Sequence, residues 1–211
     1  MFNTALSDNG VEIQLRDTYQ TDVYAQRASE FLASHGSQPF MLTISPFSPH
    51  WSSCGPGIDG RCPPQPAPQD LGTFAGAKFP RGSDFPKDPA ARARANLYWQ
   101  RELESLQSVD RMVGALVEQL RAQGELDSTY VIFQSDNGML HGEHGIFDKD
   151  VPWDRSVRVP LVIRGPGFDA GAVRNDLTAN GGVPATILDL ADAEPPRPPD
   201  GFSLLAGHRR N

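Results

Sequence analysis

A short apolar segment that ends in polar residues constrains the fold of this chain more than any other feature. Residues 129–134 are mostly apolar, β-branched or aromatic, which is typical of a buried strand. Ser135-Asp136-Asn137-Gly138 follows directly. In an α/β sheet, ligands bind just outside the carboxyl ends of the strands. We therefore expect Asp136 and Asn137 to lie in a ligand site at the end of this strand.

The strongest helical pattern lies just before this strand. Residues 90–122 carry apolar side chains at steps of three and four, and Gly124 is a typical C-terminal stop. The apolar positions are Leu103, Leu106, Val113, Leu116, Val117 and Leu120. We interpret the Arg and Glu residues of this helix as its solvated face. Shorter helices are expected at 17–34, with Thr21 as the N-cap, and at 183–191.

Three apolar segments alternate with these helices and define the expected sheet. They are residues 39–45, 129–134 and 159–164. Continuous apolar strands that alternate with amphipathic helices favour an α/β fold with a mostly parallel sheet flanked by helices. Near the start of the chain, Asn9-Gly10 precedes alternating apolar residues and predicts a hairpin turn.

Charge and hydropathy argue against two classes of partner. The 211 residues carry a formal net charge of -7 and no basic patch with interleaved aromatic residues, so we expect no nucleic-acid partner. No apolar run approaches the ~20 residues of a membrane-spanning helix, so we expect no membrane span. The first residues show no signal-peptide pattern. The sequence leaves the compartment open.

A long irregular segment covers residues 51–89, which are rich in Gly, Pro, Ser and Asp. Loops of this length are usually functional or disordered rather than simple connectors. The segment contains both cysteines, Cys54 and Cys62. Two alternatives stay open for them, a small disulfide formed in an oxidising compartment or two unpaired thiols.

Side chains suited to an ion and an oxyanion follow the strand at 129–134. Asp136 and Asn137 supply carboxylate and amide oxygens, the ligand types that a hard cation such as Ca²⁺ prefers. A plain Asp-Asn-Gly turn is the alternative. Lys149 is a candidate for stabilising an oxyanion, an effect that is strongest where water is excluded. A solvated surface lysine is the alternative there.

Three histidines are further candidates. His50 follows the segment 39–45 at the equivalent edge of the sheet, where it can donate to an anionic oxygen or protonate a leaving group. His141 and His144 either join the same site or hydrogen-bond locally, for example to Glu143. Further soft donors for a transition metal do not accompany them. The sequence has no nucleophile elbow and no Walker-type glycine loop.

The ordered set of these blocks resembles the sulfatase family of the alkaline-phosphatase-like superfamily. Counterparts of a "PFFL … PH" block and of a "T-x-V-I-F-x-S-D-N/H-G … G-E-H-G … K" block occur in the family's order, together with the helices around them. The matching stretches are 19–32, 39–50, 98–120, 129–149, 156–167, 183–191 and 200–205. The chain is most similar in character to sulfatases that act on sulfated sugars, such as the N-acetylglucosamine-6-sulfatase type.

The resemblance implies roles for five residues. Asp136 and Asn137 match calcium ligands, Lys149 matches a lysine that holds the sulfate group, and His50 matches a histidine near the leaving oxygen. His144 lies in a family motif and is a candidate substrate contact. Residues 1–211 would then be the central to C-terminal part of a sulfatase catalytic domain, with 51–89 on the active-site side. The implied reaction is hydrolysis of a sulfate ester, with a sulfated small molecule or sugar as substrate.

The resemblance also implies a nucleophile that these residues do not supply. Sulfatases use a formylglycine made from Cys or Ser in a C/S-x-P-x-R motif, which in the family lies upstream of these blocks. Cys54 and Cys62 have proline at the right offset, but both lack the arginine and both follow His50. We therefore expect the 211 residues alone to be inactive. Secretion is common in the family, so a periplasmic or secreted parent protein is plausible.

Two other functions fit the same residues. A phosphodiesterase or phosphonate hydrolase of the superfamily would use the same half-site, because phosphate and sulfate esters present similar oxyanions. A truncated homologue without catalysis would bind a ligand or nothing.

Overall fold

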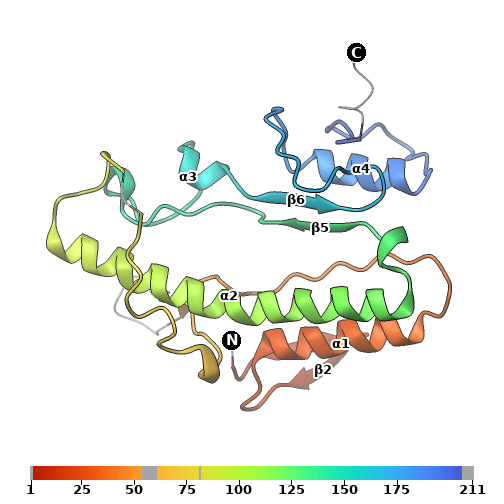
Figure 1. Cartoon of the computed structure of the whole chain (residues 1–211). Helices are drawn as coiled ribbons and strands as arrows, with labels where there is room; N and C mark the ends of the chain where they lie inside the picture. Colours follow the sequence, from red (N-terminus) through yellow and green to blue (C-terminus); the bar gives the residue numbers. More distant parts are fainter. Residues whose placement is uncertain (1, 54–60, 81, 206–211) are drawn as a thin grey trace.

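Two packed helices form the largest part of the structure. The computed structural model describes residues 2–53, 61–80 and 82–205. Helix α1 (Gln20–Ser34) lies beside the long helix α2 (Pro89–Gln123), as Figure 1 shows. The Asp88 side chain accepts a hydrogen bond from the Ala91 amide at the start of α2, and Gly124 ends the helix with φ 75°. Both long helices and the glycine stop confirm the predicted pattern.

The apolar contact between α1 and α2 is the main core. Its buried residues and the half-buried ones packed on them are Leu32, Leu120, Leu126, Phe40, Leu42, Leu116 and Val117. Apolar burial of this kind stabilises by about 25 cal/mol per Å² removed from water. None of the helices in the described residues is long and apolar enough to cross a membrane.

The prediction that Thr21 caps α1 is wrong. Tyr19 occupies the N-cap position and makes no side-chain capping bond. Thr21 is instead buried inside the first turn, and its hydroxyl lies 3.3 Å from the Ser48 hydroxyl. A buried hydroxyl needs a partner, and the loop that contains Ser48 supplies one.

The prediction that the Arg and Glu residues of α2 form a solvated face is also wrong in part. Glu104 is fully buried, and its carboxylate accepts from the Gly72 amide at 3.0 Å. Arg111 stays exposed, as predicted, and binds the buried Asp70 through two hydrogen bonds of 2.7 Å each. The segment that contains Gly72 and Asp70 covers this side of the helix, which the charge pattern of α2 alone did not reveal.

The remaining elements are short. The strands are β1 (Ala5–Asp8), β2 (Val11–Gln14), β3 (Ser52–Ser53), β4 (Arg61–Cys62), β5 (Val131–Gln134) and β6 (Leu161–Arg164). The other helices are α3 (Asp154–Val157) and α4 (Gly182–Leu190), with 3₁₀ turns at Pro68–Asp70, Leu126–Ser128 and Glu143–Gly145. Asn9 and Gly10 join β1 to β2 with positive φ angles of 51° and 86°, which confirms the predicted hairpin.

Strand direction differs from the expectation. The α/β class is confirmed, but every strand pair in the described residues is antiparallel. β5 and β6 pair with Ile132 opposite Ile163, because the chain between them turns back on itself. Residues 39–45 form no strand, so the expected parallel pairing with β5 is not made by these segments.

One of the two cysteines lies in the described part of the long loop. Cys62 is disulfide-bonded, whereas Cys54 falls outside the described residues. The alternative of an unpaired thiol is therefore wrong for Cys62.

Removing the Leu120 side chain from the α1–α2 core should destabilise the protein. We expect Leu120→Ala to lower the free energy of unfolding by about 2–5 kcal/mol, because the buried site loses apolar contacts and retains a cavity. Urea denaturation followed by circular dichroism measures this. Leu97→Ala on the same helix is the control, since Leu97 is 43% exposed. Equal losses for the two variants would contradict this assignment of the core.

Candidate functional site

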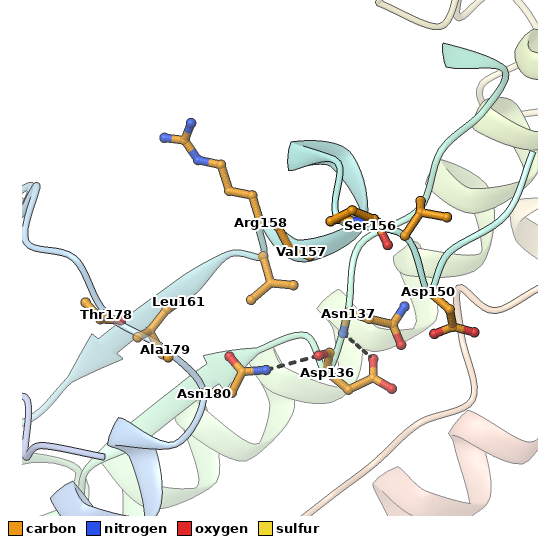
Figure 2. A pocket seen from close by; sticks show the side chains of 13 residues that line it. Asp136, Asn137, Asp150, Ser156, Val157, Arg158, Leu161, Thr178, Ala179 and Asn180 are labelled. Atoms are coloured by element: carbon orange, nitrogen blue, oxygen red, sulfur yellow. Dashed lines mark hydrogen bonds between the residues drawn. The ribbon is translucent and has the colours of Figure 1, made fainter. Parts of the chain in front are cut away.

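Asp136 and Asn137 lie at the carboxyl end of β5 and line an open cavity of about 630 Å³. The other walls come from residues 150–161 and from Thr178, Ala179 and Asn180. Figure 2 shows the side-chain ends of Asp136, Asn137 and Asp150 on the same side of the loop. The polar motif that follows the strand therefore opens on a cavity.

The structure brings Lys149 and Asn137 together. Lys149 Nζ donates to Asn137 Oδ1 at 3.1 Å. Asp136 Oδ1 accepts from the Asn137 backbone amide at 2.9 Å, so one carboxylate oxygen is used locally. An amide oxygen, a carboxylate and a lysine cation thus meet at the end of β5, which is a suitable arrangement for binding an anion beside a cation.

The backbone of this motif is held by its neighbours. The Gly138 amide donates to the Ser156 carbonyl at 2.8 Å. A Cβ on Gly138 would lie only 2.0 Å from the Arg155 carbonyl oxygen, so only glycine allows this approach. Asn180 Nδ2 donates to the carbonyl of Ser135 at 3.1 Å. It also donates to the carbonyl of Asp136 at 3.1 Å, the bond drawn in Figure 2.

Asp148, next to Lys149, forms an ion pair with Arg61 of the long loop. Arg61 Nη1 lies 2.7 Å from Asp148 Oδ2, and the Lys149 amide donates to Asp148 Oδ1 at 2.8 Å. Burial works to raise the pKa of Asp148, but these hydrogen bonds and the Arg61 charge outweigh it and hold the pKa below its usual range. Part of the segment 51–89 thus contacts the residues around Lys149.

The histidines have different surroundings. His141 is buried, and its Nε2 lies 2.8 Å from a Glu102 carboxylate oxygen on α2. His144 is exposed, stacks on Trp153 with ring centroids 4.0 Å apart, and has Nε2 3.4 Å from Asp84. His50 donates from Nδ1 to the Trp51 carbonyl at 2.9 Å and contacts the rings of its neighbours. Within the part of the chain that the structure describes, the contacts of His50 are with its sequence neighbours and do not join it to Lys149.

Asp136 and Asn137 supply only some of the oxygen ligands that a hard cation needs. Asp136 is exposed, and its Oδ2 makes no hydrogen bond within the described part of the chain. Asn137 Oδ1 already accepts from Lys149. No group of three or more His, Cys, Asp or Glu side chains that could hold a metal occurs within 2–53, 61–80 and 82–205. Since calcium takes about six to eight oxygens, Asp136 and Asn137 fit as part of a calcium shell only.

Sequence reasoning missed two residues that support the site. Asn180 comes from a segment without a helical or strand pattern, so no signal pointed to it. Arg61 lies in the irregular loop and contacts Asp148 from 87 positions away, a distance that no local pattern encodes.

Comparison with known proteins decides the family. A family model described as Sulfatase matches residues 3–193. The chain belongs to the sulfatase family. Members of this family generally use a metal ion and a formylglycine.

Among similar relatives are the extracellular sulfatase SULF-1 homolog of Drosophila melanogaster and the human N-acetylglucosamine-6-sulfatase. Each is 30% identical over 97% of this chain, which covers 20% and 39% of their lengths, respectively. The sulfatase ppz1 of Metarhizium majus is also 30% identical, over 87% of this chain and 47% of its own. The chain therefore spans less than half the length of each of these relatives.

Solved structures share the fold. The structure of BT4656 in complex with its substrate D-glucosamine-2-N,6-O-disulfate matches 96% of this chain and 54% of its own, with a TM-score of 0.79 and 23% identity. A phosphonate monoester hydrolase from Silicibacter pomeroyi matches 89% of this chain and 42% of its own, with a TM-score of 0.62 and 22% identity. The alkaline-phosphatase-like fold expected from the sequence is thus confirmed for this chain.

Removing the Arg61 charge should raise the pKa of Asp148. Because the folded pKa is lowered, the stabilisation it provides is complete above the unfolded pKa of Asp, about 3.9, and is lost as the pH falls through the folded value. In Arg61→Gln, a carboxyl NMR titration of Asp148 should move toward the ordinary Asp value. Arg92→Gln, an exposed change on α2, should leave it unmoved. An unchanged titration in Arg61→Gln would contradict the role of this pair.

Proposed function

We propose that the complete protein containing this chain hydrolyses sulfate esters, and that Asp136, Asn137, Lys149, His50 and His144 belong to its active site. The contact between Lys149 Nζ and Asn137 Oδ1 carries the proposal. It sets a lysine cation next to the side chain that matches a calcium ligand of the family. Two adjacent positive charges, the lysine and a metal, are what a sulfate group with its negative oxygens requires.

The proposed metal role belongs to Asp136 and Asn137. They would hold a calcium ion through the Asp136 carboxylate and Asn137 Oδ1, with further oxygen ligands from elsewhere in the protein. When bound, the ion supplies positive charge at the sulfate oxygens. Asn137 Oδ1 can accept from Lys149 and still offer its second lone pair, so the two roles are compatible.

Lys149 and His50 have separate roles in the proposal. Lys149 stabilises the negative charge that develops on the sulfate oxygens as the ester bond breaks. His50 uses Nδ1–H for the Trp51 carbonyl, which leaves Nε2 to carry the proton that goes to the leaving oxygen. His144 contacts the substrate beyond the sulfate group, beside Trp153.

We assign no residue of this chain as the nucleophile that attacks the sulfate ester. No C/S-x-P-x-R motif surrounds Cys54 or Cys62, so we assign only charge balance and leaving-group protonation to this chain. Its family and the names of its relatives support a sulfated sugar as substrate, with a sulfated glucosamine the first to test.

Lys149→Ala in the complete gene product should lower kcat for 4-nitrophenyl sulfate by about 10²–10³-fold, the usual cost of removing one oxyanion-stabilising donor. Asp136→Ala should lower it at least as far. Lys87→Ala is the matched control, because Lys87 is an exposed lysine on the loop before α2. Unchanged turnover in Asp136→Ala would refute the metal-ligand assignment. Faster turnover of a phosphonate monoester than of the sulfate would favour the phosphonate hydrolase instead.

A further inference from the structure

The Gly-Glu-His-Gly segment contains a buried carboxylate that none of the roles above uses. Glu143 is 1% exposed, and its Oε2 accepts from the His141 backbone amide at 2.7 Å. Its Oε1 is buried and makes no hydrogen bond to any of the residues that the structure describes. A buried carboxylate without full hydrogen bonding is strongly unfavourable unless a cation lies nearby.

The cation is Arg155, at the start of α3. Arg155 Nε lies 3.5 Å from Glu143 Oε1, an ion pair rather than a hydrogen bond. The Arg155 side chain is half exposed, so it reaches from the surface toward the buried carboxylate. The pair therefore ties the Gly-Glu-His-Gly segment to the first turn of α3.

The backbone beside Arg155 holds the motif at the end of β5. The Gly138 amide donates to the Ser156 carbonyl, and Gly138 sits directly against the Arg155 carbonyl. Asp136 and Asn137 are the two residues before Gly138. A displacement of α3 would therefore move the backbone from which both proposed metal ligands extend.

The other side of Glu143 is anchored to α2. The His141 amide binds Glu143, and the His141 ring binds Glu102 on α2. The backbone around Glu143 is also constrained, since Gly142 and His144 have φ angles of 128° and 54°. The long helix, Glu143, Arg155 and Gly138 thus form a continuous chain of contacts that ends at the proposed metal ligands.

We propose that Glu143 and Arg155 are positioning residues that fix the backbone of residues 136–138. Neither residue needs to touch substrate for this role. The consequence for catalysis rests on the proposed function, whereas the positioning itself does not. The Gly-Glu-His-Gly segment then has a structural task in the site, separate from any contact that His144 makes.

The test is residue-by-residue amide hydrogen exchange of the 211-residue chain. Glu143→Gln keeps an acceptor for the His141 amide but removes the charge that attracts Arg155. We expect exchange of the Gly138 amide to rise about tenfold, as for the loss of a partly buried charge pair, with α1 amides unchanged. Glu118→Gln is the control, because it removes the same charge from an exposed pair with Arg121. No rise at Gly138, or an equal rise throughout α1, would overturn the proposal.

Variants of Arg155 keep the test decisive if Glu143→Gln does not fold. Arg155→Gln should reproduce the local rise at Gly138, and Arg155→Lys should restore most of the protection by restoring the charge. In the double variant Glu143→Gln/Arg155→Gln, the Gly138 amide should exchange no faster than in either single variant, because both substitutions remove the same interaction. Fully additive effects would refute the pairing.

Kinetics of the complete gene product separate this proposal from the proposed function. Glu143→Gln should lower kcat for the sulfate ester more than it raises KM, since misplaced metal ligands weaken transition-state binding. If Gly138 exchange responds while Asp136→Ala leaves turnover unchanged, the proposed function fails and the positioning pair stands. If Asp136→Ala abolishes turnover while Gly138 exchange does not respond, the positioning pair fails alone.

Discussion

The irregular segment before α2 depends on that helix for hydrogen bonds that its own backbone does not make. Apart from β4 and one 3₁₀ turn, the described residues between Arg61 and Asp88 form no helix or strand. Side chains of α2 bind the backbone groups of this segment in place of a neighbouring strand. Asn96 accepts from the Phe79 amide, Gln100 donates to the Ala77 carbonyl, and Glu104 accepts from the Gly72 amide. Since buried backbone groups must be paired, the polar residues of α2 determine where this segment can lie.

Contacts from the same helix also position the loops of the candidate site. Glu102 on α2 holds the ring of His141, and His141 in turn binds Glu143. The covering segment reaches the site as well, because Arg61 pairs with Asp148 next to Lys149. Gly142 shows how tight this contact is, since a Cβ there would lie 3.0 Å from the Phe85 ring. Contacts from α2 and from α3 therefore both hold the loops at the end of β5 in place.

Local patterns predicted the elements well and their pairing poorly. Periodicity located α1, α2, β5, β6 and α4 to within a few residues, because the spacing of apolar side chains reflects which face is buried. It gave the wrong cap for α1 and treated Glu104 as solvated. Both errors have one cause: a side chain's partner came from a distant segment, Ser48 for Thr21 and the Gly72 amide for Glu104. Strand direction failed for the same reason, since alternation of elements does not state which strands are neighbours.

By itself, the sequence determined α1, α2, α4, β5, β6, the hairpin at Asn9-Gly10, the family and the polar motif at the end of β5. These follow from short-range chemistry and from the order of the motifs along the chain. Only the tertiary structure decided that Lys149 reaches Asn137, that Arg61 reaches Asp148, and that the buried Glu143 faces Arg155. Such contacts join residues 12 to 87 positions apart through the packing of loops on α2, and that packing is a property of the folded chain rather than of any local pattern.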